Sequence, residues 1–318
     1  MPNKIKIMLQ LEITHLINAI ENLRQAKHVS QKELCLGIMD PSTYSKIKKG
    51  ELSLSLKDGY EFLSRLNASW TDVESLNLFT DPQINRISKK YNQLTGNPKS
   101  SLSDIEELFQ EISSLDLKNS QLLRLYLLLK KYYSQESSYI PKIKPNEIES
   151  IFKNINISTI LTSVDYKIIG DLTSEFSIPQ LLELYPKLMV KDLEDFLVNP
   201  RSSKLYTLQG LSNIADIFID NAYFAEAENI LDNLKSTSTC INSFFYIFMY
   251  HFLNYRLQFF KEENEHRKSK ILKEFEDWIN AAQLLFKEAP QNIEPFVNSF
   301  NDLKKSQENH TKIIFRNV

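Results

Sequence analysis

Glycine is scarce in this sequence, with only 6 among 318 residues. Strands joined by tight turns need glycine where the backbone takes a positive φ, so this chain has little of the turn chemistry of a β-sheet protein. Apolar residues make up 42% of the chain, which is enough for a buried core. We therefore expect an all-α protein, and at about 150 residues per domain its length indicates two domains.

The first 78 residues carry signals for five short helices. In residues 13–26, apolar side chains recur at the three- and four-residue spacing of one buried helical face. Ser30 and Glu33 have the spacing of a capping box, and Pro41 occupies the favoured first position of a helix that we expect to end at Gly50. The expected N-caps are Ser30, Asp40, Ser55 and Thr71.

From residue 79 onward the pattern changes to long amphipathic helices that recur in pairs. Equivalent helices start about 35–40 residues apart, as in helical-hairpin repeats. The expected helices cover residues 83–95, 103–114, 119–134, 145–153, 158–174, 178–197, 202–220, 223–235, 240–262, 265–288 and 292–305. We therefore predict a small domain over residues 1–78 and a repeat domain over residues 79–318.

No catalytic or metal-binding pattern is recognisable in the sequence. The two cysteines, Cys35 and Cys240, are far apart, and the motifs of phosphate-binding loops, dinucleotide sites and metallohydrolases do not occur. We expect no enzyme activity, no cofactor and no metal, and a core position for Cys35.

The most apolar stretch is Phe244–Phe260, in which aromatic residues are concentrated. Four polar residues interrupt it, so it is too short and too polar for a membrane span, and we expect a helix that is buried on several sides. The chain lacks the pattern of a signal peptide. We therefore expect a cytoplasmic protein with no membrane partner.

Positive charge is concentrated near the N-terminus, although the whole chain has a formal charge of −2. Between Arg24 and Lys57, basic residues outnumber acidic ones by four. Lys46, Lys48 and Lys49 fall within one predicted helix turn. A local excess of this kind is typical of surfaces that bind nucleic acid phosphates.

The segment Leu23–Val73 resembles the helix-turn-helix domain of phage-repressor type found in many bacterial regulators. In that family a Ser/Thr-Gln pair opens the second helix, as Ser30-Gln31 does here. The recognition helix carries a Ser-x-Ile step before a terminal glycine, which matches Ser45-Lys46-Ile47 and Gly50. The resemblance implies that residues 41–50 form the recognition helix in the major groove of DNA. A helical bundle that binds no DNA is the alternative.

On this resemblance, short polar side chains at the start of the recognition helix reach base edges, and lysines around it neutralise phosphates. Tyr44 and Ile47 are expected to face the core, with a contact between the Tyr44 hydroxyl and a phosphate as the alternative. Many relatives carry an acid two positions before the glycine, where it tethers the domain to itself. Lys48 stands there, so we expect its charge to face DNA. The predicted DNA-binding residues are Gln31, Lys32, Ser42, Thr43, Lys46, Lys48, Lys49 and Lys57.

The segment Leu205–Leu234 resembles a tetratricopeptide repeat. Ala215 lies between apolar residues of the first helix, residues 221–223 form the expected turn, and Ala222 and Ala227 are small enough to let the two helices approach closely. An ordinary helical hairpin is the alternative. The residues expected to fill the seam between the helices are Tyr223, Ile230, Leu231 and Leu234.

A helix-turn-helix domain followed by a tetratricopeptide-like α-solenoid resembles the Rgg/GadR/MutR and PlcR-like transcriptional regulators. That resemblance implies a homodimer that binds a two-half-site operator in double-stranded DNA and pairs through its C-terminal helices. It also implies a short peptide pheromone on the concave face formed by the first helices of the repeats. The predicted ligand-binding residues are Arg124, Lys167, Asn213, Asp216, Asn242, Tyr246, Tyr250 and Asn254.

Two other functions are compatible with the sequence. The repeat domain could serve for dimerisation alone, without a ligand. In a different class, the chain could be a helical-repeat adaptor or a phosphatase-modulating protein whose N-terminal bundle binds no DNA.

Overall fold

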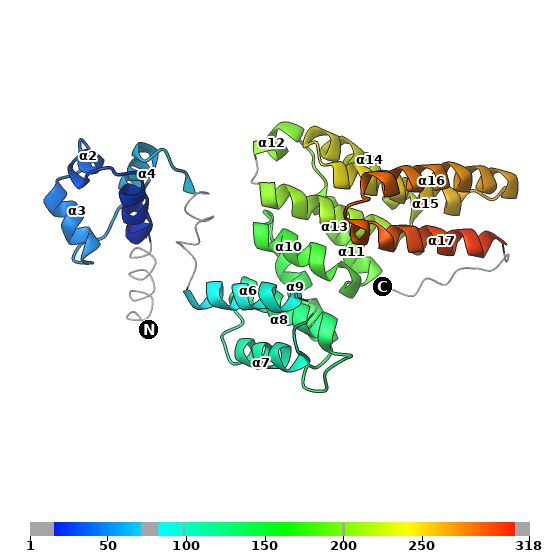
Figure 1. Cartoon of the computed structure of the whole chain (residues 1–318), viewed down its shortest axis with the longest axis horizontal. Coiled ribbons are helices and arrows are strands. Elements are labelled where there is room, and N and C mark those ends of the chain that lie inside the picture. Colours follow the sequence, from blue (N-terminus) through cyan, green and yellow to red (C-terminus); the bar gives the residue numbers. More distant parts are fainter. Residues whose placement is uncertain (1–15, 71–81, 98, 199–200, 309–318) are drawn as a thin grey trace. The chain divides into compact units, whose positions relative to one another are not determined.

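The computed structural model describes residues 16–70, 82–97, 99–198 and 201–308 (Figure 1), and every regular element in these ranges is helical. The expectation of an all-α protein is confirmed. The chain divides into two compact units, residues 1–117 and 118–318. The predicted domain boundary between residues 78 and 79, like the predicted helix capped by Thr71, lies outside the described residues and stays a prediction.

The first unit begins with a bundle of short helices. They are a helix over residues 16–26, α2 (Gln31–Cys35), α3 (Pro41–Lys48) and α4 (Leu56–Arg65). Their shared core includes Tyr44, Ile47 and Phe62, and Cys35 is fully buried in it, as predicted. Helix α7 (Leu102–Ser113) packs against α6 (Pro82–Thr95) later in the same unit.

Local signals fix the boundaries of α2 and α3. The Oγ of Ser30 accepts a hydrogen bond from the backbone N–H of Glu33 at 3.1 Å, and the Glu33 carboxylate accepts one from the N–H of Ser30 at 2.8 Å, so the predicted capping box is confirmed. Asp40 is the N-cap of α3, but within the described residues its side chain accepts no capping hydrogen bond. Gly50 follows α3 with a φ of +75°, and this left-handed backbone turns the chain away from the helix axis.

The second unit contains the remaining helices. They are α8 (Ser120–Tyr133), α9 (Pro145–Ile157), α10 (Ser163–Leu172), η1 (Thr173–Glu175), α11 (Ile178–Leu188), α12 (Leu193–Val198), α13 (Arg201–Asp220), α14 (Phe224–Cys240), α15 (Phe244–Lys261), α16 (Glu265–Leu285), η2 (Pro290–Asn292) and α17 (Glu294–Glu308). Several boundaries differ from the prediction. Helix α9 continues to Ile157, α14 continues to Cys240, and α15 starts only at Phe244. Residues 178–197 form two helices, because the chain leaves helical geometry at Met189 (φ −59°, ψ 124°), and α10 begins only after Thr162, whose side chain caps it.

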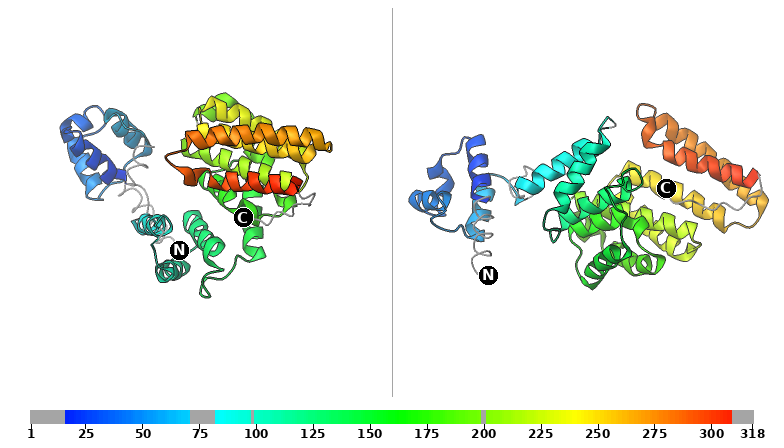
Figure 2. Two further views of the ribbon diagram at one scale, coloured as in Figure 1. Left: turned by 45° about the vertical axis from the view of Figure 1, so that its right-hand side comes forward. Right: turned by 90° about the horizontal axis from the view of Figure 1, so that it is seen from below.

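The helices of the second unit stack as antiparallel neighbours (Figure 2). The α13–α14 and α14–α15 pairs make the expected hairpins, and alternate helices also pack on one another, with α8 on α10, α10 on α13 and α13 on α15. We call α8, α10, α13 and α15 the central row. This arrangement agrees with the expected α-solenoid, in which each repeat buries its apolar face only against its neighbours.

Small residues set the close approach of these helices. Ala215 and Ala227 are fully buried between α13 and α14, as the tetratricopeptide resemblance implies. Ala222 instead lies exposed in the turn with a φ of +61°, so its small side chain is not what lets the two helices approach. Between α10 and α13, a Cβ on Gly210 would lie 3.1 Å from Cδ1 of Leu188 and 4.0 Å from the backbone nitrogen of Gly170.

The aromatic helix α15 is buried on several sides, as expected. Phe248 stacks on Trp278 with ring centroids 4.5 Å apart, and Phe252 contacts Phe275 and Phe296 at 5.5 and 5.0 Å. In the part of the chain that the structure describes, neither this helix nor any other is both long and apolar enough to cross a membrane.

Candidate functional site

Helix α3 has a buried face and an exposed face, as a recognition helix requires. Tyr44 and Ile47 lie three residues apart on the buried face, with 0% and 4% exposure, and the Tyr44 ring meets the Phe62 ring edge-on at 5.3 Å. The expectation that both residues face the core is therefore confirmed. Ser42, Lys46 and Lys49 are exposed, while Thr43 is half-buried.

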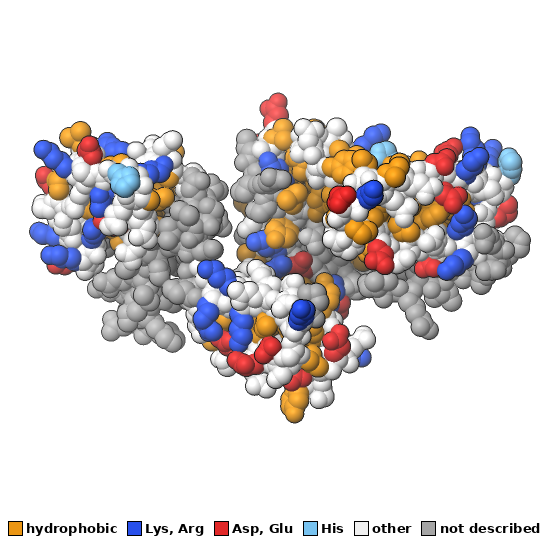
Figure 3. Space-filling view, viewed as in Figure 1, with side chains coloured by type: hydrophobic (Ala, Val, Ile, Leu, Met, Phe, Trp, Pro, Cys, Tyr) orange, Lys and Arg blue, Asp and Glu red, His pale blue; other side chains and the backbone are white. Residues whose placement is uncertain are grey.

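The exposed side chains of α3 form a continuous stripe. Positions 42, 46 and 49 are four and three residues apart, which places them on one side of a helix. At about 100° per residue, that side lies opposite Tyr44. No carboxylate in the described ranges forms an ion pair with Lys46 or Lys49. Lysine and arginine side chains are visible over the surface of this part of the chain in Figure 3.

Gln31 and Lys32 begin α2. The Gln31 amide donates hydrogen bonds to the Pro41 carbonyl at 2.8 Å and to the Ser45 hydroxyl at 2.9 Å, so it ties α2 to α3. That leaves the Gln31 side-chain oxygen as the atom available to a ligand. Lys32 is exposed beside it.

Two of the predicted phosphate-binding lysines have carboxylate partners. The Lys48 ammonium lies 2.9 Å from Oε1 of Glu21, so the expectation that position 48 makes no internal ion pair is wrong. The geometric reason is that Lys48 lies one turn after Tyr44, on the side of α3 that turns toward helix 16–26. Lys57 is far more exposed, and its partner Glu61 is 3.9 Å away.

The Tyr44 hydroxyl is also committed within the fold. It donates a hydrogen bond to Oε2 of Glu21 at 2.9 Å, and burial with this neighbouring carboxylate raises the pKa of Tyr44. The alternative in which this hydroxyl contacts a DNA phosphate is therefore wrong.

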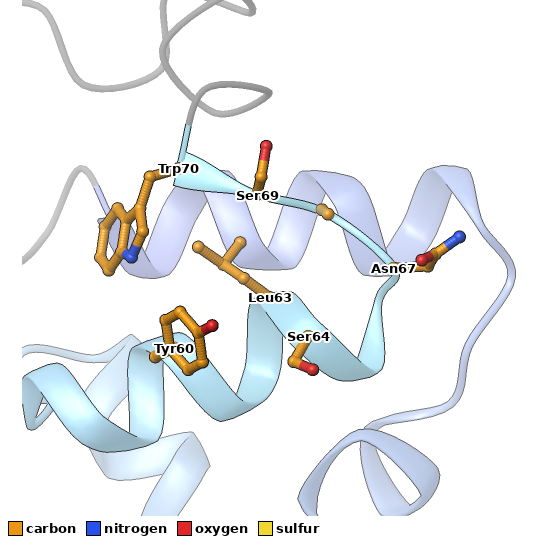
Figure 4. A pocket seen from close by; sticks show the side chains of 7 residues that line it. Tyr60, Leu63, Ser64, Asn67, Ser69 and Trp70 are labelled. Atoms are coloured by element: carbon orange, nitrogen blue, oxygen red, sulfur yellow. The ribbon is translucent and has the colours of Figure 1, made fainter. Parts of the chain in front are cut away.

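A pocket of about 340 Å³ lies beside the C-terminal half of α4. Tyr60, Leu63, Ser64 and Asn67 line it together with Ala68, Ser69 and Trp70, as Figure 4 shows. Residues 71–81, which follow directly, are outside the described ranges. None of the predicted site residues lines this pocket.

Four predicted ligand-binding residues lie on the first three helices of the central row, α8, α10 and α13. Arg124 of α8 forms an ion pair with Asp171 of α10, with Nη2 2.5 Å and Nε 2.6 Å from the same oxygen. The Lys167 ammonium lies 5.1 Å from the centre of the Tyr206 ring, so α10 and α13 also meet there.

Asn213 and Asp216 are one turn apart on α13, but each has a partner within the fold. The Asn213 amide donates to the Gly170 carbonyl at 2.8 Å, and Asp216 pairs with Arg256 of α15. Arg256 also lies 2.5 Å from Asp220 and has a side-chain exposure of only 4%. The N–H₂ group of Asn213 is thus engaged within the fold, and the role of Asn213 in ligand binding stays a prediction.

Asn242 and Tyr246 are not on a ligand-accessible helix face. Asn242 was expected on a helix, but it lies in the turn between α14 and α15 with a φ of +49°. Tyr246 is 9% exposed, and its hydroxyl donates to the Leu205 carbonyl at 3.0 Å. Burial raises the pKa of Tyr246 to about 12. Asn242 is not helical because α14 ends at Cys240 and α15 starts only at Phe244, whereas Tyr246 is on the predicted helix but faces the interior.

Tyr250 and Asn254 line a common pocket of about 510 Å³. It lies where α14, α15 and α16 meet, with Leu231, Leu257 and Ile271 supplying apolar surface. Arg256 on the same helix α15 instead points to α13. The structure thus brings Tyr250 and Asn254 together in one pocket, whose lining does not include the predicted residues on α8, α10 and α13.

Glu21, Asp171 and Arg256 are central to these hydrogen-bond and ion-pair networks, but none of them was predicted as a site residue. A signal existed for two of them. Glu21 falls four residues after Ile17 on the apolar stripe of its helix, and Arg256 lies within the most apolar stretch of the chain. Charged residues at such positions are rarely buried unless they are paired.

Solved structures with the same fold cover nearly all of the chain. A point mutant of PrgX is 18% identical with a TM-score of 0.64, and the match covers 94% of this chain and 96% of that one. The PrgX/cCF10 complex is 18% identical with a TM-score of 0.61 and 94% coverage of both chains. The Streptococcus dysgalactiae SHP pheromone receptor Rgg2 is 12% identical with a TM-score of 0.64, covering 93% of this chain and 100% of that one.

At these identities the likeness shows the fold: the chain has the all-α architecture of PrgX and Rgg2. No family model matches the sequence, and no curated protein matches it.

Proposed function

We propose that this chain is a DNA-binding transcriptional regulator of the Rgg type, whose helical repeats sense a short signalling peptide. The observation that carries the DNA-binding part is the two-sided geometry of α3. Tyr44 and Ile47 hold one side in the core, and Ser42, Lys46 and Lys49 form the exposed stripe on the other side. Short polar and cationic side chains in this order suit a helix that reads base edges and contacts flanking phosphates.

The peptide-sensing part rests on fold and on the solved relatives. The structures of similar fold include a complex of PrgX with cCF10 and a receptor for SHP pheromones. Helical-hairpin stacks offer one long face along their first helices, which suits an extended peptide. In this chain the central row carries charged and amide side chains along that path, among them Arg124, Lys167, Asn213 and Asp216.

Ligand binding along the central row would compete with contacts already present there. Arg124 and Asp171 join α8 to α10, and Arg256 joins α15 to Asp216 of α13. A peptide carboxylate or backbone that takes over one partner changes the packing of adjacent helices. Such a change can shift the population of two arrangements of the repeats only as far as the peptide prefers one of them. In a homodimer, that shift alters how two recognition helices span two operator half-sites.

Three measurements test the parts of this function separately. Fluorescence anisotropy of the full chain with duplexes from the region upstream of its own gene should show binding whose affinity falls steeply with salt. Size-exclusion chromatography with light scattering should show a dimer. For the peptide, calorimetry with synthetic peptides encoded by short reading frames beside the gene should show binding that Lys167→Met weakens. The function fails if no duplex from that region binds in a salt-dependent way.

A further inference from the structure

Four side chains donate to the carboxylate of Glu21. It is only 8% exposed. Oε1 accepts from Arg24 Nη2 at 2.6 Å, from Gln25 Nε2 at 3.0 Å and from the Lys48 ammonium at 2.9 Å. Oε2 accepts from Arg24 Nε at 3.0 Å and from the Tyr44 hydroxyl at 2.9 Å. The carboxylate is therefore saturated with donors.

Two of these donors come from α3 and lie one helical turn apart. Tyr44 and Lys48 are four residues apart, so both project from the same side of the helix. A single hydrogen bond would let α3 roll about its axis, whereas two contacts one turn apart to one fixed carboxylate set its rotation. The edge-on contact between Tyr44 and Phe62 of α4 holds the same side of α3 from a second direction.

The rotation of α3 decides which side chains can reach DNA. With Tyr44 and Lys48 turned toward Glu21, the stripe of Ser42, Lys46 and Lys49 faces away from the bundle. Lys48 differs from its two lysine neighbours, since its side chain is 37% exposed and its ammonium is engaged.

The ionised carboxylate of Glu21 also keeps the Lys48 ammonium beside it. Hydrogen bonds from Arg24, and then from Lys48 and Tyr44, lower the pKa of Glu21 far below its usual range despite the opposing effect of burial, so the carboxylate is ionised at neutral pH. Moving Lys48 to a phosphate would remove one of the two cations that contact this largely buried carboxylate within the described residues. Such an exchange gains little, because Lys48 must break one charge-assisted contact to form another.

We propose that Glu21 is a positioning residue for the recognition helix, and that it withholds Lys48 from DNA, so that Lys46 and Lys49, and not Lys48, neutralise phosphates. This inference rests on the proposed DNA-binding function. It assigns different roles to Lys46, Lys48 and Lys49, which the sequence alone does not distinguish.

The salt dependence of binding separates these roles. The full-length chain is titrated against a fluorescein-labelled duplex of mixed sequence and against a duplex from upstream of its own gene, over a series of KCl concentrations. The slope of log K against log salt is negative, and each phosphate contact makes it steeper by about 0.9 on B-form DNA. Slopes are compared below by their magnitude. Lys49→Met is expected to reduce the slope by about 0.9, and Lys48→Met is expected to leave it unchanged.

Releasing Lys48 should have the opposite effect. Glu21→Gln keeps the shape of the side chain but removes its charge, so Lys48 becomes available and the slope rises by about 0.9 on the mixed-sequence duplex. In the double variant Glu21→Gln/Lys48→Met the slope returns to the wild-type value. On the upstream duplex, Glu21→Gln should lower affinity as well, since α3 is no longer held in one rotation. A purely structural role for Glu21 predicts weaker binding without the rise in slope.

The outcomes distinguish this inference from the function on which it rests. If Lys48→Met reduces the slope as much as Lys49→Met does, Lys48 contacts a phosphate and the inference is overturned, while DNA binding stands. If the wild-type chain binds neither duplex, the function and the inference fall together. Circular dichroism checks that each variant is folded. If Glu21→Gln does not fold, the comparison of Lys48→Met with Lys49→Met still decides, because both lysines extend to the surface.

Discussion

The Tyr44 hydroxyl donates a 2.9 Å hydrogen bond to Oε2 of Glu21, which lies 23 residues earlier in the chain. This contact joins helix 16–26 to α3 inside the bundle. Both groups are buried, so the bond is shielded from water and each partner depends on the other for its hydrogen bonding. The position of the exposed stripe on α3 therefore depends on a residue outside α2 and α3.

The stability of the first unit should depend on pH through Glu21. Its pKa is lowered in the folded state, so its contribution is present above the pKa of the unfolded carboxyl, about 4.3, and is lost as pH falls below that value. The loss should reach at most about 1.4 kcal/mol per pH unit for this one group. Glu21→Gln should be less stable at pH 7 and should lack this acid-dependent fall.

Urea unfolding between pH 7 and 3 measures this effect. The chain has two tryptophans, Trp70 in the first unit and Trp278 in the second, so a Trp278→Phe background lets Trp70 fluorescence report on the first unit alone. Glu51→Gln, at an exposed carboxyl, is the control and should keep the wild-type pH profile. An unchanged profile in Glu21→Gln would contradict the assigned role.

Tyr44→Phe should destabilise the first unit without unfolding it. The ring and its packing on Phe62 remain, but Glu21 loses a hydrogen bond to its charged form, which costs about 1.5–3 kcal/mol. Tyr60→Phe on α4 is the matched control, because that side chain is 63% exposed, and it should change the free energy of unfolding by less than about 0.5 kcal/mol. Equal effects of the two substitutions would show that the Tyr44 hydroxyl contributes nothing.

Arg256→Met should destabilise the second unit by about 2–4 kcal/mol, because it leaves Asp216 and Asp220 of α13 without their shared cation. Burial raises the pKa of Asp220 to about 6, above its unfolded value, so this carboxyl takes up a proton more readily in the folded chain as pH falls. The difference in unfolding free energy between the wild type and Arg256→Met should therefore become smaller as pH falls from 7 to 5. Arg267→Met, at a 73% exposed side chain 3.8 Å from Glu262, should have little effect.

Ala227→Leu should disturb the seam between α13 and α14. The side chain of Ala227 is fully buried there, and overpacking of such a site costs about 1–3 kcal/mol. Ala225→Leu, two residues earlier on the exposed side of the same helix, should be nearly neutral. Thermal unfolding of both variants gives the comparison, and a neutral Ala227→Leu would mean that the two helices are not in close contact.

Local signals made the helix boundaries of the first unit predictable. The capping box of Ser30 and Glu33, Pro41 at the start of α3 and Gly50 after its end each act within a few residues. Interactions between residues this close in the chain can be predicted from the sequence. The break at Met189 was missed because apolar periodicity continues through it, and the nearest proline, Pro186, lies inside α11 and not at the break.

Side-chain partners across helices were much less predictable. Asn213 and Asp216 were placed on the correct helix, but their contacts with Gly170 and Arg256 join positions about forty residues apart. The pattern of a helix tells which face is buried, but not which neighbouring helix a polar side chain reaches. Tyr250 and Asn254 show the same limit, since they share a pocket on another side of α15 from Arg256.

The proposed role of α3 in DNA binding is tested most directly by the salt dependence of DNA binding in a Lys46→Met/Lys49→Met double variant. Both substitutions are on the exposed stripe of α3 and touch no buried group, so the fold should be unaffected. Fluorescence anisotropy with a duplex from upstream of the gene should show a slope of log K against log salt that is about 1.8 smaller than in the wild type. A double variant that binds this duplex with the wild-type slope and affinity would contradict the assignment of α3 as the DNA-reading helix.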